Sequence, residues 1–491
     1  MTTRVRLGWR LGREGREAVE LPLAEVLRHS VVLGKSGGGK TYLVEAVVGQ
    51  LLQETSDGVC VTVIDMKGET VDLLLALLQL MDPAVRPLPS QVCTLAPGLG
   101  YGLPLNPLTR VEGMDESTQA GVVVHLLDGL SDQSFGPRMT NVARWLVRAA
   151  MALDGSLLDV HRILTDDEFA GRVAAHMPDV EVRAYLQRTF PKERAESREA
   201  LRARIENLLA IPAERAMLCA AGSVPPERLL ESRLTLVNLA LGRLGGTRVA
   251  RFIGNWVVTL LTAAIFARKA LGNKRHSYVV IDEWQELTKI AADDIEDVLA
   301  RARSTGVSLT LINQYASQIR TASQALWDGV RTNAMLEVFF RPNEDDLHHV
   351  EAALPVTGRM VDPLRLDRLL PEHEERRLLV RFLKNLQPRQ ALVVNHSSEL
   401  PAEVISTLTL PAARAIAAWH RLPAEEKDAW RRGGWGQRLE DLTPARVRLP
   451  EPGAAGQPAA AHASRERSPS DVPRATVTRF PKGRAGKLVL S

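Results

Sequence analysis

Residues 34–41 read Gly34-Lys35-Ser36-Gly37-Gly38-Gly39-Lys40-Thr41, which matches the pattern G-x-x-x-x-G-K-[ST]. The apolar segment Ser30-Val31-Val32-Leu33 precedes it and predicts a buried strand, and the segment 42–48 that follows predicts the start of a helix. In this strand–loop–helix context the glycines let backbone N–H groups surround a polyphosphate, and the helix N-terminus adds partial positive charge. A glycine-rich turn with an incidental lysine is the alternative, and the flanking elements make it the weaker one. We therefore predict a site for a nucleoside triphosphate.

The residue types in this loop indicate which group of the nucleotide each would bind. Lys40 is expected to reach the β and γ phosphates, and the hydroxyl of Thr41 is expected to ligate Mg²⁺. The cofactors predicted from the sequence are therefore ATP and Mg²⁺. The residues predicted to bind them are Gly34, Lys35, Ser36, Gly37, Gly38, Gly39, Lys40 and Thr41.

A second predicted strand ends in two acidic residues. In the segment Tyr278-Val279-Val280-Ile281-Asp282-Glu283, the apolar run places Asp282 at the carboxyl end of the strand, where it can hold the water shell of Mg²⁺. Glu283 could polarise the attacking water as a general base. An apolar run followed by Asp-Glu is common by itself, but after a phosphate loop it indicates the second half of an NTPase site. We therefore predict Thr41 and Asp282 as metal ligands and Glu283 as a catalytic residue.

Two further kinds of group are expected to assist catalysis. Gln314 follows the strand predicted at 308–313, so it lies at the same sheet edge and could sense the γ-phosphate; a simple turn amide is the alternative. Hydrolysis of this kind is often helped by an arginine from a neighbouring subunit. Four arginines flank core elements, and of these Arg303 is favoured and Arg341 comes second, ahead of Arg301 and Arg331.

Composition limits the classes of function. The chain has 491 residues, and 45% of them are hydrophobic, which suffices for several domains. Only 4% are aromatic, which argues against an RNA or single-strand reader that stacks bases on rings. The cysteines are scattered at Cys60, Cys93 and Cys219, which indicates a reducing cytosol and no disulfide or metal framework. The apolar segment 252–267 is short for a bilayer and contains Asn255, so we expect a buried helix, no integral membrane segment and a cytoplasmic protein.

The order of strand and helix signals predicts an α/β fold. Strands alternate with helices on both sides of a long stretch of purely helical periodicity, which favours a RecA-like P-loop NTPase with a mostly parallel sheet. From residue 446 onward, nine Lys and Arg face three Asp and Glu, so this end carries a charge of +6 and the rest about −2. The predicted parts are a short β leader (1–28), the first part of the P-loop ATPase core (29–111), an all-helical insertion (112–231), the second part of the core (232–400), a C-terminal helical segment (401–444) and a disordered basic tail (445–491).

Several motifs in this order resemble one family of motors. They are the loop 34–41, Asp65-Met66-Lys67-Gly68-Glu69, Leu105-Asn106-Pro107-Leu108, Val280-Ile281-Asp282-Glu283-Trp284, Ala302-Arg303-Ser304-Thr305-Gly306-Val307 and Ile312-Asn313-Gln314. The series looks like the HerA/FtsK group of RecA-like ATPases, especially the soluble domain of TraG-type coupling proteins of conjugation and type IV secretion. The helical insertion resembles the all-α domain of those coupling proteins, and the resemblance covers about residues 29–400.

The resemblance implies an activity and partners. Members of the group form hexameric rings, hydrolyse ATP and drive DNA through a central channel, which implies a homo-hexameric DNA translocase with DNA as partner and an accessory nuclease or relaxase as a further candidate. Lys40, Thr41, Asp282, Glu283 and Gln314 would then carry the family roles already argued for them. Asp65 and Lys67 match a family element near the nucleotide.

Three functions stay open at this point. The first is a DNA-translocating ring ATPase, the second is an ATPase that acts on protein cargo in secretion or assembly, and the third is an NTPase partner that gates a nuclease or another defence effector. DNA-stimulated hydrolysis would favour the first, hydrolysis that ignores nucleic acid the second, and binding without turnover the third. The basic tail is expected to contact DNA phosphates or to be a solvated extension.

Overall fold

The structure is a computed structural model of the whole chain. It describes residues 3–53, 58–68, 70–131, 134–193, 195–239, 247–271, 275–287, 298–299, 302–343, 346, 354, 356, 361–362, 365–397, 402–447 and 449.

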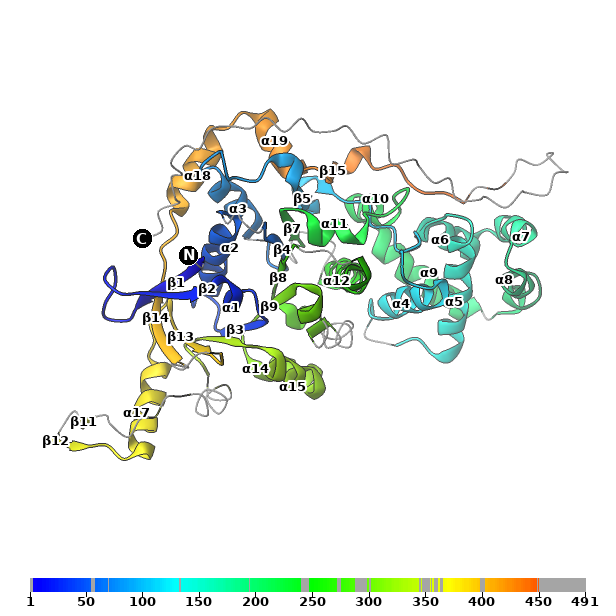
Figure 1. Ribbon diagram of the computed structural model, residues 1–491. Helices are drawn as coiled ribbons and strands as arrows, with labels where there is room; N and C mark the ends of the chain where they lie inside the picture. The colour runs from blue at the N-terminus through cyan, green and yellow to red at the C-terminus, as the bar shows by residue number, and fades with distance from the viewer. Residues whose placement is uncertain are drawn as a thin grey trace.

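The core is an 11-stranded sheet, and the strands from β10 to β5 are parallel (Figure 1). Beyond β10 the remaining strands pair antiparallel. The predicted mostly parallel α/β sheet is thus confirmed. In sheet order the strands are β2 (Ala18–Pro22), β1 (Arg4–Arg10), β14 (Ala402–Thr407), β13 (Gln390–Asn395), β10 (Leu336–Phe340), β3 (Ser30–Gly34), β9 (Val307–Asn313), β8 (Ser277–Asp282), β4 (Cys60–Asp65), β7 (Leu234–Asn238) and β5 (Val92–Leu95).

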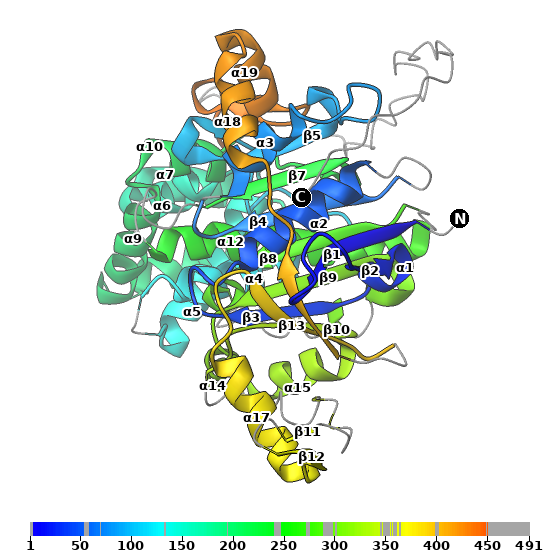
Figure 2. The same ribbon diagram turned by 90° about the vertical axis from the view of Figure 1, so that its left-hand side faces the viewer.

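Helices cover both faces of the sheet because successive strand side chains point to opposite sides. Val31 and Leu33 of β3 join one core cluster, while Val32 between them joins the other. The residues of both clusters are buried. Because the parallel strands are buried on both faces, their sequences are continuous apolar runs rather than alternating apolar and polar residues. On the face of Val32 lie α2 (Lys40–Gln53) and α3 (Thr70–Leu78), and on the other lie α12 (Thr247–Leu271), α14 (Ala316–Ala322) and α15 (Gln324–Asn333) (Figure 2).

The long apolar helix α12 belongs to this core. Its window Arg248–Arg268 is the one stretch of the described chain that is long and apolar enough to cross a membrane, and 83% of it is buried inside the protein. Burial of this kind is expected for a core helix. The predicted helix at 252–267 therefore forms, and it packs against the sheet.

The all-helical insertion packs beside α12, away from β1, β13 and β14 (Figure 1). The helical periodicity after residue 112 predicted it, and the helices α4, α5, α7 and α9 overlap the stretches where that periodicity is strongest. The insertion contains α4 (Glu116–Asp128), α5 (Pro137–Met151), α6 (Leu157–Thr165), α7 (Asp167–His176), α8 (Val180–Ala184), α9 (Ala195–Leu209), α10 (Pro212–Leu218) and α11 (Pro226–Glu231).

The ends of the chain differ from the sequence prediction in three ways, of which the third concerns the tail boundary. The β leader is part of the main sheet, since β1 pairs with β14 as well as with β2. The segment 401–444 is not purely helical, because β14 precedes α18 (Ala412–Arg421) and α19 (Ala424–Arg432). The run Val404-Ile405 in β14 is β-branched, and a strand there completes the antiparallel edge.

After α19 the chain crosses to the helical insertion and packs on it. The short strand β15 (Gln437–Arg438) pairs with β6 (Tyr101–Gly102). The N–H of Ala445 donates to the carbonyl of Cys219 at 2.7 Å, and the N–H of Val447 donates to Asp159 Oδ1 at 3.2 Å. The tail boundary predicted at 445 therefore falls inside a packed segment, which we call the strap (residues 437–447). Residues 451–491 of the predicted basic tail lie outside the described residues.

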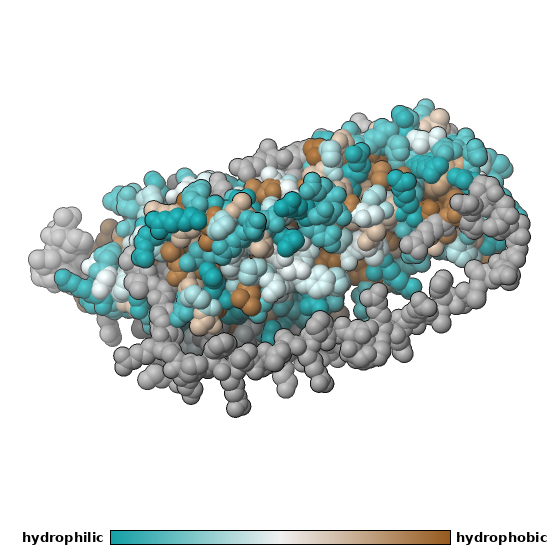
Figure 3. Space-filling model, turned by 90° about the horizontal axis from the view of Figure 1, so that it is seen from above, coloured by the Kyte–Doolittle hydropathy of each residue, from teal (hydrophilic) through white to brown (hydrophobic). Residues whose placement is uncertain are grey.

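Smaller elements complete the described chain. Helix α17 projects away from the sheet together with the hairpin of β11 and β12 (Figure 2). On the face of the molecule seen from above, hydrophobic residues are scattered among hydrophilic ones (Figure 3). These elements are α1 (Leu23–Val26), α17 (Glu372–Lys384), β11 (Val361–Asp362) and β12 (Arg365–Leu369).

Candidate active site

Strand order brings the predicted site residues to one edge of the sheet. β9 lies between β3 and β8, and the pairs Leu33↔Asn313 and Ile312↔Asp282 put the carboxyl ends of all three strands at one level. Neighbouring strands are about 4.8 Å apart, so β8 lies about 10 Å from β3. The phosphate loop, Gln314 and the acidic pair therefore leave the sheet side by side.

Close backbone approach explains two of the loop glycines. Gly34 has φ +150°, and a Cβ there would lie 2.3 Å from the carbonyl oxygen of Phe340 on β10. Gly39 has φ +108°, and its Cβ would lie 3.0 Å from Cα of Arg389. The N–H of Arg389 also donates to the carbonyl of Gly38 at 2.7 Å, so the residue before β13 packs against the loop and is hydrogen-bonded to it. No pattern in the sequence linked Arg389 to a loop so distant along the chain.

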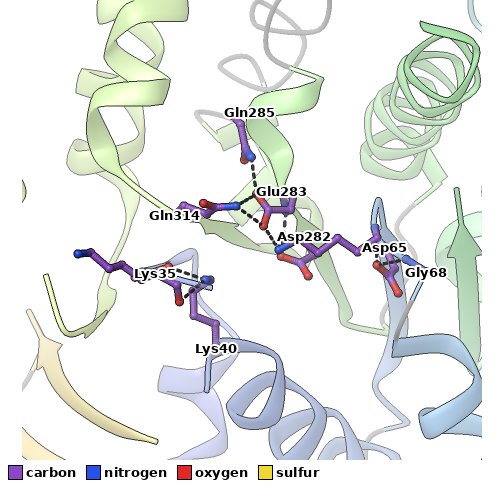
Figure 4. A network of polar contacts seen from close by, with 10 residues as sticks. Lys35, Lys40, Asp65, Gly68, Asp282, Glu283, Gln285 and Gln314 are labelled. Atoms are coloured by element: carbon purple, nitrogen blue, oxygen red, sulfur yellow. Dashed lines mark hydrogen bonds and ion pairs between the residues drawn. The ribbon is translucent and has the colours of Figure 1, made fainter. Parts of the chain in front are cut away.

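Lys40 turns its side chain back into the loop. Its Nζ donates to the carbonyl of Lys35 at 3.1 Å and to the carbonyl of Gly34, and only 5% of the residue is exposed (Figure 4). Burial lowers the pKa of Lys40, and the carboxylates of Glu283 and Asp282 oppose that effect. An ammonium buried against carbonyls alone is only partly compensated, and a polyphosphate would supply the missing negative charge.

Asp282 lies at the end of β8, beside another buried carboxylate. Asp65 ends the adjacent strand β4 in register with Asp282. Asp282 is 5% exposed and Asp65 is 0% exposed. Burial, together with the nearby charges of Asp65 and Glu283, raises the pKa of Asp282 to about 6. Like charges crowded in a dry site need a cation, and Mg²⁺ takes carboxylate and hydroxyl oxygens readily. The oxygens of Asp282 and Thr41 therefore fit a magnesium site.

Glu283 is the most heavily bonded side chain at this edge (Figure 4). It has a left-handed backbone, with φ +52°, and is 3% exposed. Lys67 forms an ion pair with Oε1, and Nε2 of Gln314 donates to both oxygens at 3.1 and 3.3 Å. Nε2 of Gln285 donates to Oε2. Burial alone would raise the pKa of Glu283, but these hydrogen bonds outweigh it and lower the pKa, so the carboxylate form is favoured.

The Asp65 element acts on this network through the backbone. Asp65 Oδ1 accepts from the N–H groups of Lys67 and Gly68 at 2.9 and 2.8 Å, and Oδ2 accepts from the N–H of Thr70 at 2.7 Å. Both oxygens are thus used to fold the turn that presents Lys67 to Glu283. Glu69, the last residue of this predicted element, lies outside the described residues. The sequence placed Asp65 and Lys67 near the nucleotide, but it gave no sign of the pairing with Glu283 or of Gln285.

The predicted arginines occupy different edges of the sheet. Arg303 lies in the 3₁₀ turn Ala302–Thr305 before β9, hence at the amino edge, a strand length of about 20 Å from the phosphate loop of its own chain; its side chain is outside the described residues. Arg341 follows Phe340, the partner of Gly34, so it lies next to the loop of its own chain, with Nε donating to the carbonyl of Lys384 at 3.2 Å. Arg331 lies in the last turn of α15, before β10, and Arg301 is outside the described residues.

A phosphate loop with a buried lysine, an acidic strand end two strands away and a glutamine on the strand between them define a P-loop NTPase of the RecA-like type. Two family models match the chain: the central domain of the helicase HerA over residues 5–97, and the TraM recognition site of TraD and TraG over residues 276–354. No curated protein sequence matches the chain.

Solved structures share the fold at low sequence identity. The unbound conjugative coupling protein TrwBΔN70 has a TM-score of 0.52 and 16% identity, over 79% of this chain and 86% of that one. TrwB with ADP and Mg²⁺ has the same score and identity over 83% and 95%. VirB4 of Thermoanaerobacter pseudethanolicus has a TM-score of 0.51 and 16% identity over 84% and 98%. The chain thus shares the RecA-like P-loop fold of these coupling proteins, and its matches to the HerA and TraD/TraG family models over parts of the chain agree with the resemblance that its motifs predicted.

Proposed function

We propose that this protein binds ATP and Mg²⁺ at the edge formed by β3, β9 and β8, hydrolyses the ATP, and uses the energy to move DNA. The observation that carries the proposal is the buried Glu283, which is held as a carboxylate opposite the phosphate loop by Gln314 and Lys67. A general base must be unprotonated, hydrogen-bonded and close to the attacking water.

The roles follow from position. Backbone N–H groups of the loop and Lys40 bind the phosphates, and Thr41 and Asp282 hold Mg²⁺. Mg²⁺ held by these two residues would supply positive charge to the phosphate oxygens. Glu283 takes the proton of the attacking water, and Gln314, which donates to both Glu283 oxygens, fixes the direction in which that carboxylate points. The complexes of TrwB with ADP and Mg²⁺ and with ATP and GTP analogues support the choice of ligand.

We further propose that the active form is a ring, a homo-hexamer by analogy with the family. In the described structure the backbone of Arg303 lies at the sheet edge opposite its own loop, which suits a group that serves a neighbour's nucleotide. Arg341 lies beside its own loop and is better placed to act within its chain. Mixed rings of Arg303→Ala and Glu283→Gln subunits should regain part of the activity, because some interfaces then hold both intact groups. The same mixing is repeated with Arg341→Ala in place of Arg303→Ala. If rings that mix Arg303→Ala and Glu283→Gln subunits regain no activity, the trans role of Arg303 is contradicted.

DNA as the moved polymer rests on the family resemblance, and we place the protein in the cytoplasm, acting with a relaxase or nuclease. The test is ATP turnover with and without duplex and single-stranded DNA, alongside the mass of the protein in solution. Stimulation by DNA is expected. Turnover that is robust but indifferent to nucleic acid would point to protein cargo, and nucleotide binding without turnover to a regulatory NTPase.

A further inference from the structure

The helical insertion contains an open cleft that the nucleotide site does not use. It measures about 840 Å³ and lies between the first turns of α5 and the segment that follows α8. Arg138 and Asn141 line one wall from α5, and Arg188, Thr189 and Lys192 line the other. All five side chains are exposed.

Three cations, Arg138, Arg188 and Lys192, line this cleft. Among the described residues, no carboxylate pairs with Arg138, Arg188 or Lys192. Elsewhere in the same domain arginines are matched with acids, for example Arg148 with Asp179 at 2.7 Å and Arg198 with Asp167 at 2.9 Å. Several arginines of this domain are thus balanced locally, whereas the cleft gathers three cations in one lining and concentrates positive potential there.

The wall that carries Arg188 and Lys192 is held in place by packed rings. After α8 the chain forms one π-helical turn, Tyr185–Thr189, and single π turns recur at functional sites. The ring of Tyr185 stacks on Trp145 of α5 with centroids 5.1 Å apart, and it contacts Phe190 at 6.5 Å. The two walls are thus joined beneath the cleft, and the basic side chains project from a fixed frame.

The single acid in the lining, Glu193, offsets only one of the three positive charges. Glu193 accepts a hydrogen bond from the hydroxyl of Tyr185 at 3.4 Å, which ties it to the aromatic frame. Pro137 is the one apolar residue in the lining, whereas a groove that captures a peptide needs hydrophobic pockets for side chains. Arg, Lys, Asn and Thr side chains are those that contact phosphate oxygens along a nucleic-acid backbone.

We propose that this cleft binds the phosphodiester backbone of the DNA on which the motor acts, through Arg138, Arg188 and Lys192, with Asn141 and Thr189 as neutral hydrogen-bonding groups. The contact is independent of base sequence, because it is made to phosphate oxygens, which every nucleotide carries. The helical insertion thereby holds DNA beside the ATPase core. This inference rests on the proposed function, since it takes DNA as the polymer.

The test compares two full-length variants that lose the same charge. The cleft variant is Arg138→Gln with Arg188→Gln and Lys192→Gln. The control is Arg110→Gln with Arg162→Gln and Arg215→Gln, which removes three exposed arginines of the same region outside the cleft. Binding of a labelled DNA duplex and of a labelled single strand is measured over a range of salt concentrations, together with ATP turnover in the absence of DNA.

The cleft variant should lose DNA affinity by on the order of tenfold or more, and the slope of log K against log salt should fall by about 2 to 3 for three lost phosphate contacts. The control should keep the wild-type slope, and both variants should keep DNA-free turnover. Equal slopes in the cleft variant and the wild type would overturn the proposal. A cleft variant that keeps the DNA affinity of the wild type but no longer binds polyglutamate would also overturn the proposal, because the cleft would then bind an acidic protein segment. A wild-type protein that binds no DNA would instead refute the proposed function itself.

Discussion

Replacing Asp65 by Asn tests whether this buried carboxylate builds the site or contacts the nucleotide. In Asp65→Asn, the amide oxygen can still accept from the N–H groups of Lys67 and Gly68, but the NH₂ group then faces the N–H of Thr70. One charge-assisted hydrogen bond is lost and a buried N–H is left unpaired, because Thr70 is 4% exposed. We expect a loss of about 2–3 kcal/mol in stability and a fall of roughly 5 °C in the thermal midpoint.

Asp65→Asn should weaken ATP binding only a few-fold, since the loop residues remain, but turnover should fall more because Lys67 is no longer held against Glu283. The matched control is Asp82→Asn, which removes an exposed turn contact to the N–H of Ala84 and should cost less than about 0.5 kcal/mol. Thermal unfolding and ATP titration measure both effects. A variant with an unchanged midpoint and no ATP binding would refute the role in building the turn, because Asp65 would then act on the ligand directly.

Three other changes have clear expected outcomes. Gly39→Ala should weaken ATP binding by tenfold or more, since the added Cβ would lie 3.0 Å from the Cα of Arg389. The control Gly37→Ala adds a Cβ with no atom within 4 Å, so it should cost only the strain of a positive φ. Equal losses of ATP affinity in the two variants would contradict the packing argument. Burial lowers the pKa of His276 to about 4, so the unfolded chain, with a pKa near 6.5, binds a proton first as pH falls. Stability should therefore drop between pH 6.5 and 4 by at most about 3 kcal/mol, and His276→Gln should reduce that drop in thermal midpoints at several pH values; an identical drop would assign the acid sensitivity to other groups. Truncation after Leu442 should lower the thermal midpoint because it removes strap contacts with the helical insertion, whereas truncation after Leu449 should not, and equal midpoints would show that the strap adds no stability.

Much of the fold was predictable because local physics specifies it. The parallel strands are apolar, β-branched runs, and the strand–loop–helix order around residues 34–41 leaves little freedom for the phosphate loop. Asp282 and Gln314 were predictable at the same edge because both end parallel strands. The matches to family models and the shared fold confirm the class, while the catalytic roles of individual residues stay predictions.

The remaining features depend on contacts between distant parts of the chain. Nothing near Lys67 in the sequence indicates that its side chain pairs with Glu283, and nothing near Arg389 indicates that it supports Gly39. The strap packs through backbone hydrogen bonds and a few isolated apolar side chains such as Leu442, so it shows no apolar periodicity and its composition resembles that of a tail. The segment 401–444 was predicted as helical because α18 and α19 make up much of it, and the short strand β14 before them was missed.

The most direct test of the account is the rate of ATP hydrolysis by Glu283→Gln and by the wild type, each with and without DNA, in parallel with ATP binding. The variant keeps the shape and hydrogen-bonding capacity of the side chain but cannot accept the proton of the attacking water. We predict unchanged ATP affinity, a fall in turnover of at least about 100-fold, and DNA stimulation in the wild type alone. Turnover of Glu283→Gln close to that of the wild type would contradict the assignment of the general base, and with it the central claim about this site.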